Sequence, residues 1–119
     1  MMEHISPENL LFLDIETIPQ TSKYEEMDDA RKRLWAKKSQ FFLKEGENPE
    51  DIFQRSGIYA EFGKIICISV GHLYSNDGEP GARIKSFYGD DEVEILQEFK
   101  QMLLKYAKSR EFSLCAHNG

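Results

Sequence analysis

The chain has 119 residues, of which 40% are hydrophobic, 30% charged and 12% aromatic, a composition typical of one folded domain. No apolar run approaches the ~20 residues of a membrane span, and the first residues lack the basic segment of a signal peptide, so we expect a cytoplasmic protein with no membrane partner. The net charge of −6 excludes a protein that coats nucleic acid through a basic surface alone. An acidic enzyme can still act on nucleic acid when divalent cations offset its carboxylates.

The regular structure begins with an unbroken apolar run, residues 10–13 (LLFL). It leads into Asp14, Ile15 and Glu16, and Pro19 ends it soon after. An apolar run without alternation is typical of a strand that is covered on both faces. We therefore expect a central strand here, followed by a loop over residues 19–22.

Residues 24–45 predict a long helix, acidic at its start and basic later, as the helix dipole favours. Gly46 would end it, and Asn48 with Pro49 would start a short helix that ends near residue 57. Together these segments predict a helical insert over about residues 24–57. The apolar stripe of the long helix would consist of Met27, Leu34 and Phe41, flanked by Ala30, Trp35 and Phe42.

The second half of the chain predicts two strands joined as a hairpin, then a helix and a last strand. The turn signal is Asn-Asp-Gly at 76–78, and Asp90 would cap the helix. The order of strand, helical insert, hairpin, helix and strand predicts an α/β fold with a mixed sheet. The four later elements are expected at 64–73, 82–88, 91–108 and 112–116. The helical period would turn the following apolar residues toward a core: Ile95, Leu96, Phe99, Met102, Leu103 and Tyr106.

The residues with the clearest chemical potential are Asp14 and Glu16. Side chains two apart in a strand share a face, so the two carboxylates would project together, on the side of Leu10 and Phe12. Two carboxylates at the end of a buried strand repel each other unless a cation joins them, and a hard divalent metal suits oxygen ligands. The alternative is a solvated acidic pair at a strand terminus, which is common.

The segment FLDIET resembles the first motif of the DEDD (DnaQ-like) 3′-5′ exonucleases, which have the RNase H-like fold. Further segments agree in order: GKIICISVG and RIKSFYG resemble the next two strands, DEVEILQEFKQML the first long helix, and CAHNG the start of the second motif. The insert is similar to that of a bacterial subgroup related to the proofreading domain of family-B DNA polymerases. The resemblance thus implies that residues 1–119 are the N-terminal part of one exonuclease domain that is truncated at its C-terminal end.

The resemblance implies that Asp14 and Glu16 are catalytic residues and ligands of Mg²⁺ or Mn²⁺ in a two-metal hydrolysis. Thr17 would lie beside the 3′-terminal nucleotide, and Asn118 would position the substrate. The implied partner is the 3′ end of nucleic acid, single-stranded DNA in the first instance. The family's two remaining aspartates would lie beyond Gly119, so we expect this chain alone to have little or no activity and to expose surface that promotes self-association.

Two other classes stay open: a non-catalytic module that binds nucleic acid or protein, and a different metal-dependent phosphoryl-transfer enzyme. The remaining polar and aromatic residues have ordinary structural readings. His72 and His117 are expected to be structural, and Cys67 and Cys115 to be reduced core thiols. Tyr59 and Phe62 would anchor a core or loop, or stack on a base. A basic cluster in the long helix is either a solvated face or a surface that contacts the DNA backbone. It consists of Arg31, Lys32, Arg33, Lys37 and Lys38.

Overall fold

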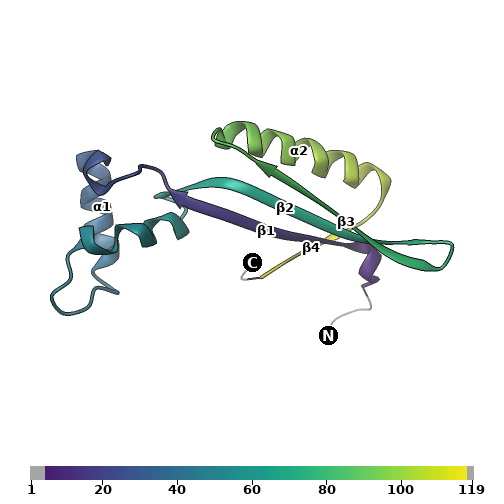
Figure 1. Ribbon diagram of the computed structural model, residues 1–119, viewed down its shortest axis with the longest axis horizontal. Coiled ribbons are helices and arrows are strands. Elements are labelled where there is room, and N and C mark those ends of the chain that lie inside the picture. The colour runs from purple at the N-terminus through teal and green to yellow at the C-terminus, as the bar shows by residue number, and fades with distance from the viewer. Residues whose placement is uncertain (1–4, 118–119) are drawn as a thin grey trace. The chain divides into compact units, whose positions relative to one another are not determined.

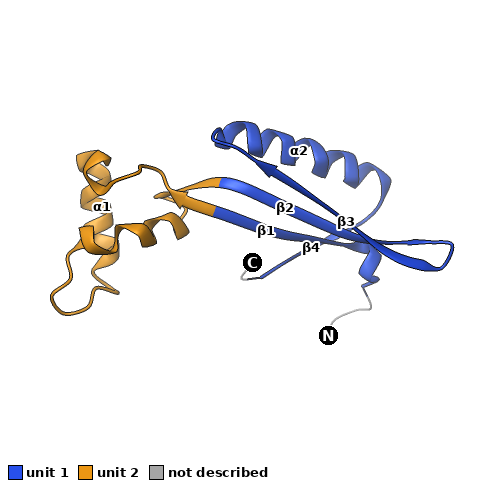
Figure 2. Ribbon diagram, in the orientation of Figure 1, with its two compact units in different colours: residues 1–16, 66–119 blue, residues 17–65 orange. Residues whose placement is uncertain are grey.

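The computed structural model describes residues 5–117 and shows a mixed α/β arrangement (Figure 1). The chain divides into two compact units, unit 1 with residues 1–16 and 66–119 and unit 2 with residues 17–65 (Figure 2). The predicted order of strand, helical insert, hairpin, helix and strand is confirmed. The elements are η1 (Pro7–Asn9), β1 (Leu10–Pro19), η2 (Tyr24–Glu26), α1 (Asp29–Ser39), η3 (Pro49–Ile58), β2 (Gly63–Asn76), β3 (Glu79–Tyr88), α2 (Glu92–Ser109) and β4 (Ser113–Ala116), where η marks a 3₁₀ helix.

The four strands form one mixed sheet in the order β3-β2-β1-β4. β2 and β3 pair antiparallel, whereas β1 and β4 pair parallel, with Leu10 opposite Ser113 and Leu13 opposite Ala116. β1 is therefore internal in the sheet, as predicted, and β4 lies at its edge. A parallel neighbour requires a crossover connection, and the segment from the hairpin through α2 supplies it.

The hairpin between β2 and β3 forms because its turn residues tolerate a left-handed backbone. Asp77 and Gly78 have φ values of 52° and 82°, the two positive angles that a two-residue type I′ turn requires. The ladder runs without interruption from Asn76 opposite Glu79 to Cys67 opposite Tyr88. Both strands are longer than expected because the pairing continues up to the turn itself.

Helix α2 covers one face of the sheet in unit 1 (Figure 1). Its N-cap is Asp91, whose carboxylate accepts hydrogen bonds from the backbone N–H groups of Val93 and Glu94, so the prediction of Asp90 was wrong by one residue. Of its expected core residues, Leu96 is exposed instead. No helix in the described part of the chain is long and apolar enough to cross a membrane. The buried apolar side chains between helix and sheet are Leu11, Ile68, Val70, Phe87 and Ile95.

The opposite face of this sheet is open. Phe12, in the part of β1 that pairs with β4, keeps 39% of its surface exposed, and Ile84 on β3 keeps 79%. Among the described residues of unit 1, the long helix α2 lies on the other side of the sheet (Figure 1). The prediction that β1 is covered on both faces was therefore wrong, because the apolar run reflects an internal position in the sheet and not two covering layers.

In unit 2 the expected helix over 24–45 is replaced by two shorter pieces, η2 and α1. The break comes at Asp28, whose carboxylate accepts a 2.7 Å hydrogen bond from the backbone N–H of Arg31 and caps α1. The helix ends at Ser39, so Met27 precedes it and Phe41 follows it, and the predicted stripe does not form. Leu34 and Phe41, two of its three members, are 57% and 81% exposed.

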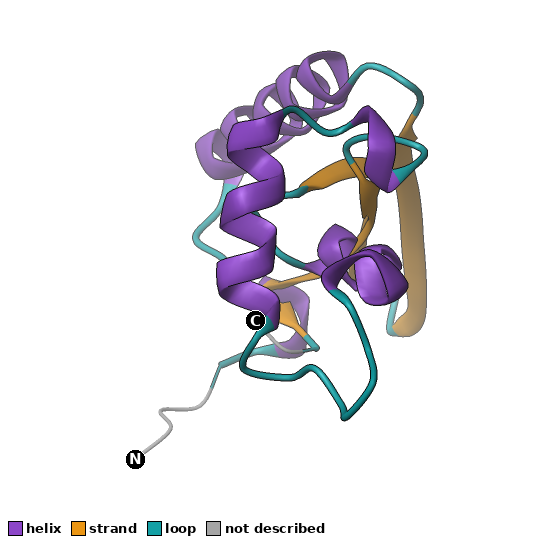
Figure 3. Ribbon diagram, turned by 90° about the vertical axis from the view of Figure 1, so that its left-hand side faces the viewer, coloured by secondary structure: helices purple, strands orange, loops and turns teal. Residues whose placement is uncertain are grey.

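The core of unit 2 is instead built around Trp35, which is completely buried. Its indole N–H donates a 2.8 Å hydrogen bond to the carbonyl of Pro49, and its ring packs edge-on against Phe62. The long loop after α1 returns the chain to η3 (Figure 3), where the backbone N–H of Asn48 donates to the Asp51 carboxylate at 2.8 Å. The insert thus has a core of its own, which the chain length alone did not predict. The buried cluster consists of Met27, Trp35, Phe53 and Phe62, with Tyr24, Phe42, Ile52 and Tyr59 packed against it.

Candidate functional site

Asp14 and Glu16 lie on β1 just beyond its last pair with β4, Leu13 opposite Ala116. Both belong to one continuous strand, so their side chains share a face, the open face of Phe12. Both residues are exposed to solvent. The unbroken strand agrees with the expected shared face, which stays a prediction. The argument from desolvation does not hold, because both residues are exposed to solvent.

A hollow of about 480 Å³ lies on this open face. β1 contributes Phe12 and Asp14 to its lining, and the parallel strand and its extension contribute Cys115 and His117. Asp14 and His117 each follow directly on the last pair of the two parallel strands, and both line this hollow at the carboxyl end of β4, the end of a parallel strand where α/β sheets commonly bind ligands. Glu16 does not line this hollow.

Ser69 is the polar residue that β2 contributes to the lining, and it contacts two neighbours outside the hollow. The hydroxyl of Ser69 lies 2.7 Å from that of Ser86, and the Cys67 thiol lies 3.7 Å from the Ser69 hydroxyl. Cys115 is an exposed free thiol and Cys67 a half-buried one, so the expectation of two core thiols was wrong for Cys115. The uncovered face explains the difference, because nothing in the described chain packs over that side of β4.

His117 is the residue that sequence reasoning set aside. Its place in the hollow next to Asp14 follows from the parallel pairing of β1 with β4. The sequence shows two apolar strands that are each followed by a polar residue. If the two strands are parallel neighbours, these polar residues lie close together. That pairing could not be read from the local pattern alone.

The donor set fits a hard cation only in part. Asp14 and Glu16 supply carboxylate oxygens, the ligand type that Mg²⁺ and Mn²⁺ prefer. Among residues 5–117, however, no group of three or more His, Cys, Asp or Glu side chains is arranged to hold a metal ion. A two-metal centre needs several bridging carboxylates, so these two residues would be one part of such a centre.

The other two predicted site residues are Thr17 and Asn118. Thr17 is exposed at the next position of β1 and belongs to unit 2. Asn118 lies outside the described residues. Their roles at a 3′-terminal nucleotide stay predictions.

Unit 2 holds a second acidic pair that the sequence did not indicate. The hydrogen bond that Glu50 donates to Glu25 raises the pKa of Glu50, whereas hydrogen bonding to its own backbone and to Glu50 lowers the pKa of Glu25. The two carboxyl groups therefore share a proton more readily than isolated ones would. This is a useful comparison for Asp14 and Glu16 in any metal-binding experiment.

The basic cluster of α1 is largely occupied within unit 2. Arg31 pairs with Asp28 at 3.1 Å and Lys38 with Glu61 at 2.9 Å. Lys32 donates to the backbone carbonyl of Glu25 at 3.3 Å. These contacts favour the reading of a solvated helix face over that of a DNA-binding ridge.

Comparisons with known proteins found no matching family model, no matching curated protein and no matching solved structure. The site is therefore interpreted from its own chemistry. An exposed carboxylate pair beside a histidine, at the carboxyl ends of parallel strands, can bind a divalent cation and through it a phosphate oxygen.

Proposed function

We propose that this chain is part of a metal-dependent 3′-5′ exonuclease with an RNase H-like sheet, acting on the 3′ end of single-stranded DNA. The single observation that supports it most is the D-x-E pair at Asp14 and Glu16 on the open face of an internal strand. The sheet order with a parallel β1–β4 pair and an antiparallel β2–β3 hairpin is compatible with that fold. The proposal also includes Mg²⁺ or Mn²⁺ as the cofactor.

In this proposal Asp14 and Glu16 hold the cations, which when bound would offset the charge that develops on the scissile phosphate. The exposure of both carboxylates leaves the phosphodiester free to approach from solvent. Phe12, exposed beside them, offers a flat apolar surface against which a terminal base would stack. His117 would contact the same phosphate region from the neighbouring strand.

Binding of the cation is the most direct test, because it does not require a complete catalytic centre. Mn²⁺ added to the 119-residue chain should broaden the backbone NMR signals of Asp14 and Glu16 before all others. Asp14→Asn with Glu16→Gln should weaken this site by more than roughly tenfold, since even supporting groups around metals cost 10–100-fold when removed. Glu25→Gln is the matched control, because it removes one member of the other acidic pair.

The outcome that counts against the proposal is also specific. Broadening that centres on Glu25 and Glu50, or that survives Asp14→Asn with Glu16→Gln, would remove the reason to place a cation on β1. The accompanying assay is hydrolysis of a 3′-labelled single strand with Mg²⁺ or Mn²⁺. We expect little or no cleavage from residues 1–119 alone, and cleavage that Asp14→Ala abolishes from any longer product of the same gene.

A second candidate function is a non-catalytic module that binds nucleic acid or a protein partner. The open face favours it, because Phe12, Ile84 and Tyr88 present apolar surface without a covering layer in the described chain. Retention of a labelled single strand by the chain without metal, and with Asp14→Ala unchanged, would select this function over the exonuclease.

A further inference from the structure

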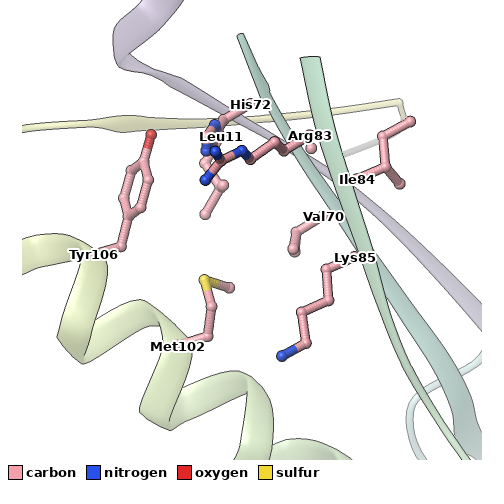
Figure 4. A pocket seen from close by; sticks show the side chains of 9 residues that line it. Leu11, Val70, His72, Arg83, Ile84, Lys85, Met102 and Tyr106 are labelled. Atoms are coloured by element: carbon pink, nitrogen blue, oxygen red, sulfur yellow. The ribbon is translucent and has the colours of Figure 1, made fainter. Parts of the chain in front are cut away.

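A second cavity lies on the covered side of the sheet in unit 1, between α2 and the β2–β3 hairpin (Figure 4). Its volume is about 370 Å³, within the ~300–1,000 Å³ range of small-molecule sites. Leu11, Val70 and Met102 form its apolar part. It is a different space from the Asp14 hollow, which opens on the other face of the same sheet, and the inference below does not depend on the proposed exonuclease activity.

The charged side chains of this cavity are all cationic. Arg83 and Lys85 on β3 line it, and no Asp or Glu of the described chain does. Neither cation forms an ion pair with a described carboxylate, although the chain carries 21 acidic against 15 basic residues. Ring faces hold them in place: the guanidinium of Arg83 lies 5.2 Å from the Tyr74 ring and the Lys85 ammonium 5.0 Å from the Phe87 ring.

Two flat polar side chains complete the lining, His72 on β2 and Tyr106 on α2 (Figure 4). Their ring centroids are 5.8 Å apart and their planes are tilted by 34°. The Nδ1 atom of His72 and the hydroxyl of Tyr106 are buried and have no hydrogen-bond partner among the described residues. Buried polar atoms of this kind are normally satisfied, so these two are the groups that a bound acceptor or donor would engage.

The position of the two cations follows from the strand register. Arg83 is opposite His72 and Lys85 is opposite Val70, so both basic side chains leave β3 on the α2-facing side. In Figure 4 the Arg83 guanidinium lies beside the His72 ring, and Lys85 extends along the other end of the cavity. A ligand between them would meet a cation at each end and apolar or flat surfaces along its body.

We propose that this cavity binds a small phosphate monoester carried on a flat, apolar body. A phosphate suits the Arg83 end of the cavity because it carries close to two negative charges and a guanidinium can donate to two of its oxygens at once. Lys85, at the other end, adds positive potential without contacting the same group. The flat body matches the rings of His72 and Tyr106 and the apolar side chains beside them. Leu11, Val70 and Met102 would exclude water from that body.

The test uses phenyl phosphate as the probe, with inorganic phosphate and phenol as its two halves, added to the whole 119-residue chain under NMR observation. Phenyl phosphate should bind saturably and shift the signals of His72, Met102 and Tyr106. Each half should bind at least about tenfold more weakly, because it loses either the charge contacts or the buried apolar area. Equal affinity for either half, shifts centred on Asp14 and His117, or no binding at all would overturn the proposal.

Two variants separate the charge from the shape of the cavity. Arg83→Gln with Lys85→Gln, both at exposed positions of β3, should weaken phenyl phosphate binding by roughly tenfold or more. Lys100→Gln on α2, outside the cavity, is the matched control and should change nothing. Met102→Trp fills the apolar part and should abolish phenyl phosphate binding, with inorganic phosphate binding unchanged. Unaltered affinity in the double variant, or an equal loss in Lys100→Gln, would show that the cations do not form this site.

Discussion

Units 1 and 2 bury their apolar side chains in different ways. In unit 1 the residues that pack between α2 and the sheet are mainly aliphatic and follow the periods of their helix and strands. In unit 2 the buried cluster is mainly aromatic and draws on one short α-helix, 3₁₀ segments and loops. Unit 2 therefore depends on a few large side chains, whereas unit 1 spreads its burial over regular elements.

The difference bears on function. The hollow with Asp14 and the cavity with Arg83 both lie in unit 1, where paired strands fix the direction of each side chain. Rigid elements place chemical groups more reproducibly than loops do. Unit 2 offers ion pairs and ring contacts that satisfy one another, so its polar groups have less capacity left for a ligand.

The largest expected effect is that of Trp35→Ala, which removes the centre of the unit 2 core. Because the side chain is completely buried and bonded to the Pro49 carbonyl, we expect a loss of about 3–5 kcal/mol in the free energy of unfolding. Hydrogen exchange followed by NMR should show lost protection in α1 and η3, with protection kept in α2 and in the hairpin beyond Ile66.

Leu34→Ala is the matched control, since its side chain lies next to Trp35 in sequence and is exposed. It should change stability by less than about 0.5 kcal/mol. Loss of protection throughout α2 in the Trp35 variant would show that the two units do not unfold separately. Equal losses in the two variants would contradict the assignment of the core to Trp35.

A smaller effect tests the two faces of the unit 1 sheet. Ile68 on β2 is 1% exposed and faces α2, whereas Ile84 on β3 is exposed on the open face. Ile68→Ala should cost about 2–5 kcal/mol, and Ile84→Ala less than about 0.5 kcal/mol. Urea unfolding measures the loss in the free energy of unfolding for each variant, and so compares two isoleucines of one hairpin that lie on opposite faces of the sheet. Comparable losses would mean that the face of Ile84 is covered after all.

The sequence predicted unit 1 well because its patterns are local. The Asn-Asp-Gly turn fixed the hairpin, and the helical period placed Ile95, Phe99 and Met102 on the side of α2 that meets the sheet. The long helix of unit 2 was predicted wrongly because helix propensity continues through Asp28, although that residue acts as a cap in the structure. Helix propensity is averaged over many residues, so it does not indicate where a single side chain accepts a hydrogen bond from the backbone and starts a new helix.

The candidate site shows the same division between local and long-range information. The shared face of Asp14 and Glu16 rests on strand alternation, which a local pattern can predict. The place of His117 depends on the parallel pairing of β1 with β4, residues about a hundred positions apart in the chain, which no local pattern reveals. The apolar run of β1 wrongly predicted a cover on both faces, since such a run shows that a strand is internal without showing what lies above it, whereas exposed surface was expected from the resemblance to a truncated domain.

The smallest expected effect is a pH dependence of α1 in unit 2. The backbone N–H of Arg31, followed by its guanidinium charge, holds the pKa of Asp28 below its usual value. Such a carboxylate stabilises the fold above its unfolded pKa of about 3.9, and the contribution is lost as the pH falls through the lower folded value. Asp28→Asn keeps a capping side chain but cannot titrate, so wild type should be the more stable of the two at neutral pH. Thermal unfolding between about pH 7 and pH 2 should show that advantage shrinking in the acid range, and a difference that stays constant to the lowest pH would exclude Asp28 as its source.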